Sequence, residues 1–475
     1  MDTKLTGKTR IESDLIGARE IPAEALYGVQ TLRGIENFSI SKFRLSEYPL
    51  FIKGLAITKM AAAMANFELG LLTVEQKDAI IAACGEILDG KHHDQFPVDM
   101  IQGGAGTTTN MNANEVIANR ALELMGHERG EYQYCSPNDH VNCSQSTNDA
   151  YPTAIHIGMY FKHLQLLPHL EELIASFRKK GEEFSRIIKM GRTQLEDAVP
   201  MTLGQTFNGF ASILQDEIAH LNEAAADFLV VNMGATAIGT GICAEPGYAE
   251  KCIAALREIT GWDIRLSSDL VGATSDTSCL VGYASAMKRV CVKMNKICND
   301  LRLLASGPRC GLGEFNLPAM QPGSSIMPGK VNPVIPEVVN QICYRIIGND
   351  LTVTFAAEAG QLQLNVMEPV MVHAIFSSIK MLQKGMDRLR ILCVEGITAN
   401  TQHCREMVLN SIGIVTALNP TLGYENSSRI AKRALKENRS VYDLVLEEGL
   451  LTKDELDQLL KPESMIKPHK FYKKK

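Results

Sequence analysis

The stretch FNGFASILQDEIAHLNEAAADF, residues 207–228, carries apolar side chains at steps of three and four, with one adjacent pair, over about six helical turns. The apolar positions are Phe207, Phe210, Ala211, Leu214, Ile218, Leu221, Ala225 and Phe228. This spacing places one apolar stripe along a long helix. Residues 287–305 repeat the pattern, and residues 336–353 and 362–394 have helical patterns too. The sequence therefore predicts a bundle of long helices.

Length and composition extend this prediction to the whole chain. The 475 residues are 45% apolar and 21% charged, which is typical of a globular protein, and the length suggests two or three domains. We expect an all-α fold of three domains: a mostly helical N-terminal domain (1–142), a central long-helix bundle that also forms oligomers (143–399), and a small helical C-terminal domain (400–475). The formal net charge of −6 gives no basic surface of the kind that binds nucleic acid.

The sequence shows no signal for export or for a membrane. The first 14 residues are polar and charged, and the longest uncharged stretches (198–215, 228–244 and 407–424) are broken by Gly, Asn and Thr. The 12 cysteines include no C-x-x-C pair, which favours free thiols in a reducing compartment. We therefore expect a cytoplasmic protein without a membrane partner. The five lysines of residues 467–475 are expected to form a solvated end.

Polar segments between the long helices are the expected sites of chemistry. Residues 102–114, 145–153, 191–205, 234–241 and 307–336 are rich in Gly, Ser, Thr and Asn, and we expect them to form loops. One of them contains GSSIMPGKV (323–331), which differs from a phosphate-binding P-loop in its glycine spacing and in the valine after the lysine. The chain also has no G-x-S-x-G or H-E-x-x-H motif, so neither hydrolytic signature applies.

Five ordered motifs carry a family resemblance that covers nearly the whole chain. They are QGGAGTTTNMN (102–112), QSTND (145–149), GRTQ (191–194), GSSIMPGKVNP (323–333) and GITAN (396–400). With these motifs the chain resembles the fumarase/aspartase superfamily, whose members eliminate ammonia, water or another nitrogen leaving group from succinyl-type substrates.

Within the superfamily the chain resembles the branch that converts L-aspartate to fumarate and ammonia. Sequences of the fumarase branch have His after G-R-T, where this chain has Gln194. Activating water requires a base, whereas ammonia is already a nucleophile that an amide could position. The alternatives are a fumarate hydratase or another lyase of the superfamily, and a structural relative without activity.

The resemblance also implies how the enzyme assembles and what it requires. It implies a homotetramer in which loops of three subunits form each active site. It implies no organic cofactor, and it admits Mg²⁺ as an activator, although no carboxylate cluster in the sequence marks a site for the metal.

The reaction itself suggests which residue types the site needs. Removing a Cβ proton from aspartate creates an enediolate with two negative charges on one carboxyl group, so the site needs many hydrogen-bond donors. The candidate donors are Thr107, Ser146, Thr147 and Ser325. Lys330 and Asn332 are candidates for the other carboxylate, with Arg33 as a further clamp. The candidates for the amino group are Asn148, Thr193 and Gln194.

The resemblance assigns the base to Ser324, the first serine of the G-S-S loop. A serine acts as a base only if N–H groups and a nearby cation stabilise its oxyanion. The alternative for Ser324 is a turn residue that caps its neighbours. The alternative for Lys330 is an exposed surface lysine, and the alternative for the hydroxyls of Thr107, Ser146, Thr147 and Thr193 is a helix cap.

Overall fold

The computed structural model describes residues 7–461, which divide into two compact units. Among the described residues, the first unit comprises residues 7–167, 219–289 and 344–382. The second comprises residues 168–218, 290–343 and 383–461. Each unit therefore combines segments that are far apart in the sequence.

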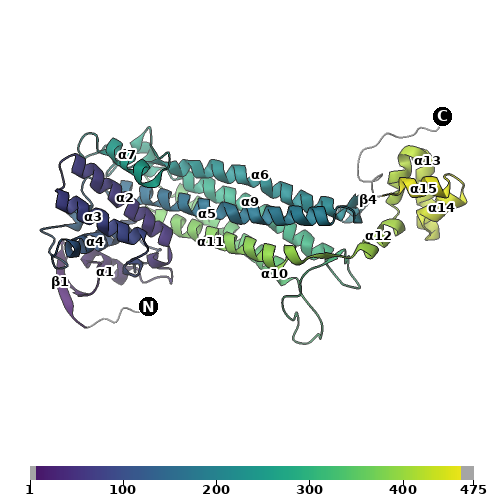
Figure 1. Ribbon diagram of the computed structural model, residues 1–475, viewed down its shortest axis with the longest axis horizontal. Coiled ribbons are helices and arrows are strands. Elements are labelled where there is room, and N and C mark those ends of the chain that lie inside the picture. The colour runs from purple at the N-terminus through teal and green to yellow at the C-terminus, as the bar shows by residue number, and fades with distance from the viewer. Residues whose placement is uncertain (1–6, 462–475) are drawn as a thin grey trace. The chain divides into compact units, whose positions relative to one another are not determined.

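The first unit is built around short and medium helices with two small strand pairs. Its helices are α1 (Val29–Asn37), α2 (Pro49–Glu68), α3 (Val74–Leu88), α4 (Thr107–Leu124), α7 (Tyr248–Thr260) and α8 (Leu270–Ser275), with the short turns η1 (Leu45–Glu47), η2 (His93–Gln95), η3 (Pro137–Val141) and η4 (Asp227–Leu229). Strands β1 (Thr9–Asp14) and β2 (Gly17–Pro22) pair antiparallel, and β5 (Val230–Val231) pairs parallel with β6 (Arg265–Leu266). Figure 1 shows α2, α3 and α4 lying together in this unit.

Helix α2 lies at the centre of the core of the first unit. Ile57, Ala61 and Ala65 of α2 belong to a buried cluster with Leu256 of α7 and Ile157. Helix α2 is the one helix in residues 7–461 that is long and apolar enough to cross a membrane, and 72% of its most apolar window is buried. A core helix has this composition because protein surrounds it on all sides.

Five long helices contribute residues to both units. They are α5 (Thr147–Glu183), α6 (Leu203–Ala226), α9 (Ser278–Leu304), α10 (Val334–Glu358) and α11 (Glu368–Leu392). Within the first unit, Asn349 of α10 donates to Ser378 of α11 at 2.9 Å. Within the second, Arg302 of α9 donates to Asn340 of α10 at 3.3 Å. These helices confirm the predicted long-helix architecture.

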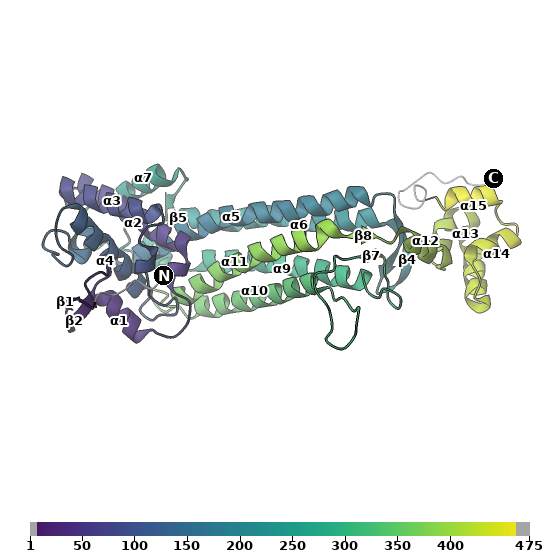
Figure 2. The same cartoon turned by 60° about the horizontal axis from the view of Figure 1, so that its bottom comes forward.

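The second unit also contains the C-terminal helices and two strand pairs. Its further elements are β3 (Ile188–Thr193), β4 (Glu196–Thr202), β7 (Phe315–Asn316), β8 (Thr398–Ala399), η5 (Val394–Gly396), α12 (Thr401–Asn410), α13 (Ile414–Glu437), α14 (Val441–Glu447) and α15 (Lys453–Leu459). Figure 2 shows α13, α14 and α15 grouped together. Their shared core includes Leu418, Ile430, Leu444 and Leu456. Gly423 adopts a φ of 79° inside α13 and interrupts it.

Some of the expected loops are regular structure. Residues 188–202 form the β3–β4 hairpin, so the loop predicted at 191–205 is wrong. Helices α4 and α5 begin at Thr107 and Thr147, inside two other expected loops. The division into domains at 142 and 399 stays a prediction. The C-terminal lysines, 467–475, lie outside the described residues.

Candidate functional site

The first turns of α4 and α5 bring four of the predicted site residues together in the first unit. Asn110, one turn into α4, donates from Nδ2 to Thr147 Oγ1 at 3.2 Å. A Cβ on Gly106 would lie 2.5 Å from the Tyr151 ring, so only glycine allows α4 to begin so close to α5. Thr107 begins the helix whose next turn, at Asn110, contacts Thr147 at the start of α5. The two helix N-termini carry the positive ends of their helix dipoles, which favour a carboxylate.

The predicted site residues of this group also make local hydrogen bonds. Thr107 Oγ1 donates to Gly104 O at 2.7 Å, and Ser146 Oγ accepts from Asn148 N at 3.2 Å, as a capping hydroxyl does. Asn148 Nδ2 donates to Ala237 O at 2.7 Å. Ser146, Thr147 and Asn148 are partly exposed, and Thr107 is exposed, so all four can still reach a ligand.

Two buried charged residues, Lys59 and Asp149, hold the loop that precedes α5. Lys59 Nζ donates to Asn142 Oδ1 at 3.0 Å and to Gln145 Oε1 at 2.8 Å. Asp149 accepts from the backbone N–H groups of Ser146 (2.9 Å), Gly234 (3.0 Å) and Thr236 (2.9 Å). The two side chains thus fix both ends of the QSTND motif.

No motif in the sequence marks Lys59 as a functional residue or assigns a role to Asp149. The available signal was a lysine inside the apolar helical run of residues 57–69. Burial lowers the pKa of Lys59 to about 7, and Asp149 opposes that shift. Burial raises the pKa of Asp149 to about 6, against the hydrogen bonds from the backbone. Both groups therefore titrate nearer to neutral pH than exposed residues of their types.

Arg33 is occupied by another residue of the first unit. Its Nε and Nη2 atoms each donate to Asp14 at 2.7 Å, and Nη2 also donates to Gly17 O at 2.7 Å. This bidentate pair holds the pKa of Asp14 below its usual value. The role of Arg33 as a substrate clamp stays a prediction, and the pairing with Asp14 does not favour it.

In the second unit, Thr193 and Gln194 lie at the tip of the β3–β4 hairpin. Gln194 and Leu195 adopt φ values of 55° and 68°, which are the left-handed conformations of a two-residue hairpin turn. Thr193, Gln194 and Leu195 are all exposed. The base of the hairpin is anchored by Glu314, a buried carboxylate that pairs with Lys189 at 2.9 Å and with Arg192. The hairpin therefore presents Gln194 on a rigid support.

Ser324 accepts two hydrogen bonds from the backbone of its own loop. Its Oγ accepts from Ile326 N at 3.2 Å and from Met327 N at 2.9 Å. This is the geometry of a turn residue that caps its neighbours, which is the alternative role for Ser324. It is also the donor arrangement that would stabilise an oxyanion at Oγ. The two interpretations are compatible, because the same N–H groups serve both.

The loop that carries Ser324 is closed at its neck. Gly323 N donates to Lys330 O at 2.7 Å, and Asn332 Nδ2 donates to Gly323 O at 2.8 Å. The amide nitrogen of Asn332 is thus engaged in loop closure. Ser325 and Lys330 are exposed. Within residues 7–461 the Lys330 ammonium has no hydrogen bond or ion pair, which leaves it available to an anion.

The described residues do not fit a resident magnesium site. In residues 7–461, no group of three or more His, Cys, Asp or Glu side chains is arranged to hold a metal ion. Mg²⁺ bound by protein requires oxygen ligands, above all carboxylates. We therefore take no step of the reaction through a metal.

Comparisons with known proteins agree with these motifs. A family described as lyase matches residues 17–348, and one described as fumarase C C-terminus matches residues 414–467. An aspartate ammonia-lyase of Pseudomonas canavaninivorans is 58% identical over 97% of this chain and 97% of its own length. The chain belongs to the aspartate ammonia-lyase family.

Solved structures of related lyases share the fold with this aspartate ammonia-lyase family member. A fumarate lyase/delta crystallin from Brucella melitensis, bound to cobalt, matches with a TM-score of 0.95 and 52% identity over 97% of this chain and 100% of that one. A class II fumarase from Schistosoma mansoni matches with a TM-score of 0.91 and 34% identity over 98% and 100% of the two chains.

Proposed function

We infer that the chain is an aspartate ammonia-lyase, a carbon–nitrogen lyase that reversibly converts L-aspartate to fumarate and ammonia. Full-length relatives of that name at 58% identity support the activity. The structural observation that carries the mechanism is the pair of backbone N–H groups directed at Ser324 Oγ, at 3.2 and 2.9 Å.

In the proposed first step, the Ser324 oxyanion removes a proton from Cβ of aspartate. The N–H groups of Ile326 and Met327 would disperse the negative charge on Oγ, and the Lys330 ammonium on the same loop would lower its energy further. The electron pair left on Cβ moves into the adjacent carboxyl group and forms the enediolate. Collapse of the enediolate then forms the double bond and expels ammonia.

The enediolate needs hydrogen-bond donors, because its two negative charges make it the intermediate of highest energy. We propose that Ser325 and the hydroxyls of Thr107, Ser146 and Thr147 contact its oxygens. Lys330 and Asn332 then bind the second carboxylate. Such donors contribute to rate only to the extent that they bind the enediolate more strongly than the substrate.

Release of ammonia, rather than water, is supported by Gln194. An amide at the tip of a rigid hairpin can orient an amino group but cannot act as a base towards water at neutral pH. Asn148 and Thr193 would supply further neutral dipoles to the amino group. The likeness to a class II fumarase makes fumarate hydratase the second candidate.

Assembly into a homotetramer with shared sites is part of the proposal. On α10, the side chains of Tyr344, Leu351 and Phe355 are 58%, 53% and 59% exposed. Spacings of seven and four place them on one face, which forms an apolar stripe. A second copy of the chain is the occupant that the proposal requires, because loops of three subunits would complete each site.

The activity is tested by following fumarate absorbance with purified protein. L-aspartate should give fumarate, and L-malate should give none above background. Fumarate from L-malate at an equal or higher rate would identify a hydratase instead. Repeating the assay with and without Mg²⁺ tests activation by the metal. A cytoplasmic location also stays a prediction, which fractionation of source cells would test.

Shared sites are tested by mixing inactive subunits. Ser324→Ala and Thr147→Val alter different loops, so random reassembly at equal ratio should restore about a quarter of the wild-type sites. The matched control is Ser324→Ala with Lys330→Ala, because both changes lie in one loop and no site would receive an intact copy. No recovery in the first mixture, with mixed tetramers verified by mass, would contradict sharing.

A further inference from the structure

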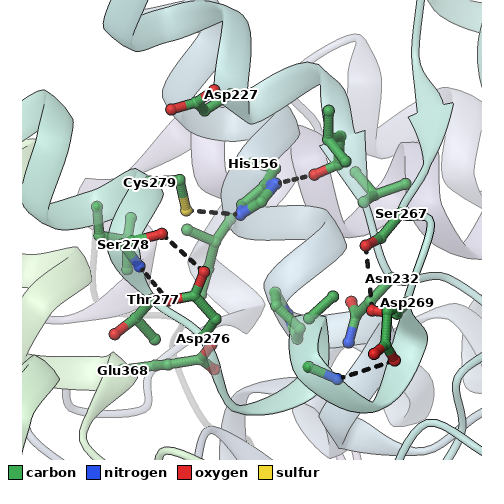
Figure 3. A pocket seen from close by; sticks show the side chains of 17 residues that line it. His156, Asp227, Asn232, Ser267, Asp269, Asp276, Thr277, Ser278, Cys279 and Glu368 are labelled. Carbon is green, nitrogen blue, oxygen red and sulfur yellow. Dashed lines mark hydrogen bonds between the residues drawn. The ribbon is translucent and has the colours of Figure 1, made fainter.

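The first unit contains a cavity of about 460 Å³ that none of the predicted site residues lines. Its walls come from α5, η4, β5, α8 and the starts of α9 and α11 (Figure 3). Pro152, Ile155, Val230 and Leu280 give it apolar surface, and Asn232, Thr277 and Ser278 give it polar groups. A volume of this size holds a small organic molecule.

Glu368 is the unusual residue of this cavity. Its side chain is only 7% exposed, and in residues 7–461 its carboxyl group has no hydrogen bond or ion pair. Figure 3 shows the side chain extending from the start of α11 into the group of residues that line the cavity. A buried carboxyl without a partner is costly, and nearly all buried polar groups in proteins are paired. A positively charged or hydrogen-bonding group in the cavity would therefore stabilise the Glu368 carboxyl.

The charges around the cavity indicate what that group is. Asp227, Asp269 and Asp276 also line it, whereas none of the described lining residues is a lysine or an arginine. Four carboxyl groups without a fixed cation disfavour a dicarboxylate such as aspartate or fumarate and favour a cation.

The remaining titratable pair in the wall is neutral. His156 Nδ1 lies 2.8 Å from Val230 O, which assigns the proton to Nδ1 and leaves Nε2 to accept from the Cys279 thiol at 3.2 Å. Burial lowers the pKa of His156 to about 4 and raises that of Cys279 to about 12. The imidazole therefore supplies no positive charge, and the thiol is not a nucleophile at neutral pH.

We propose that this cavity binds a small aliphatic ammonium compound whose positive group pairs with the carboxyl of Glu368. The apolar wall receives the carbon chain, and a diamine would place its second ammonium near the exposed aspartates at the rim. The proposal does not rest on the lyase reaction, because no residue of the proposed active site lines the cavity. The site is distinct from a metal site, since its polar lining is dispersed around an apolar surface.

The first test measures binding of 1,4-diaminobutane to the full-length protein by calorimetry. One equivalent per subunit should bind, and 1,4-butanediol, which has the same length without charge, should bind at least tenfold more weakly. Glu368→Gln should weaken diamine binding at least ~10-fold, as expected for loss of a charge-assisted bond. Glu358→Gln is the matched control, because Glu358 is exposed on α10 and lies outside the cavity.

The second test needs no variant and so remains informative if Glu368→Gln fails to fold. Burial raises the pKa of Glu368 to about 8, so the free carboxyl is mostly protonated at pH 7. Pairing with an ammonium ionises it, so diamine binding should release protons, measured by calorimetry in buffers of different ionisation heat. His156, Cys279 and Tyr151, the facing groups with shifted pKa values, stay in one protonation state at this pH.

The two binding experiments have distinct outcomes for and against a site for ammonium compounds. Saturable binding with proton release and dependence on charge supports the proposal. Equal diamine affinity in Glu368→Gln and wild type, equal binding of the diol, or binding without proton release would overturn it. Absence of saturable binding would overturn it as well.

Discussion

At the scale of single residues, Ser324 is the most consequential assignment. We predict that Ser324→Ala lowers kcat by at least ~10²-fold, because an essential base contributes at least that much. Binding of succinate, which has no amino group to lose, should change little. Steady-state kinetics and inhibitor titration provide the measurements. Near-normal turnover in the variant would transfer the proton abstraction to another group. Ser325→Ala is the matched control, since it removes a donor to the enediolate but leaves the base.

Glu368 gives a residue-scale prediction for stability against pH. Its pKa rises from 4.5 to about 8 on folding because burial disfavours the charged form. Its contribution to stability is therefore complete below about pH 4.5 and is lost as pH rises through 8. The Gln side chain of Glu368→Gln cannot ionise, so the variant does not lose this contribution. The free energy of unfolding of wild type should therefore fall relative to that of the variant as pH rises from 5 to 8. Urea unfolding across this range measures the difference, and a constant difference would contradict the raised pKa.

Two pairs of residues show which functional side chains a sequence can reveal and which it cannot. Ser324 and Lys330 were selected because their motif has a distinctive order of residue types. Lys59 and Glu368 carry no such motif. Their importance arises from what folding places around them, namely two amide oxygens for Lys59 and the wall of a cavity for Glu368. The order of residue types in the sequence does not show which individual polar side chains folding will bury.

At the scale of secondary structure, the β3–β4 hairpin offers a test of backbone strain. Leu195 has a φ of 68°, a conformation that costs a residue with a Cβ roughly 1–2 kcal/mol. We predict that Leu195→Gly raises the free energy of unfolding by about 1 kcal/mol, after the entropy cost of glycine. The control is Val199→Gly on the adjacent strand, which should destabilise because its extended backbone has no such strain. Thermal unfolding of both variants provides the test: the melting temperature should rise in Leu195→Gly and fall in Val199→Gly.

The same hairpin shows why some elements escaped prediction. Its turn uses Gln194 and Leu195 instead of the Asn-Gly or Asp-Gly pairs that announce a two-residue turn. The long helices were predictable because their apolar residues recur over many turns, as in residues 207–228. The starts of α4 and α5 were placed in loops, because Thr, Asn and Ser favour turns as much as first helical turns. The helical pattern predicted for residues 362–394 is regular only from Glu368, where α11 begins with Pro369 in its first turn.

At the scale of the whole molecule, the apolar stripe on α10 predicts dependence of activity on assembly. Leu351→Glu with Phe355→Glu would place two charges where a second copy is expected to pack. We predict that this double variant dissociates to smaller species and loses activity, because its sites would lack loops from neighbouring subunits. Light scattering and the fumarate assay on the same samples measure both effects. The control is Leu435→Glu, which changes another exposed leucine, 67% exposed, on α13. Retained mass and activity in the double variant would exclude the stripe from assembly.

The closed neck of the Ser324 loop has a consequence for how such an enzyme could be altered. The bonds from Gly323 N to Lys330 O and from Asn332 Nδ2 to Gly323 O join the two ends of the loop. Its interior between Ser325 and Gly329, residues 326–328, can thus be treated as a cassette whose replacement leaves the helical scaffold unstrained. Libraries randomised at these positions should keep the wild-type melting temperature while substrate range varies. Gly323→Ala should lower that temperature, since its Cβ would lie 2.8 Å from Asn332 N and Lys330 O. Selection for new amino acid substrates would then begin inside the cassette and leave the neck of the loop unchanged.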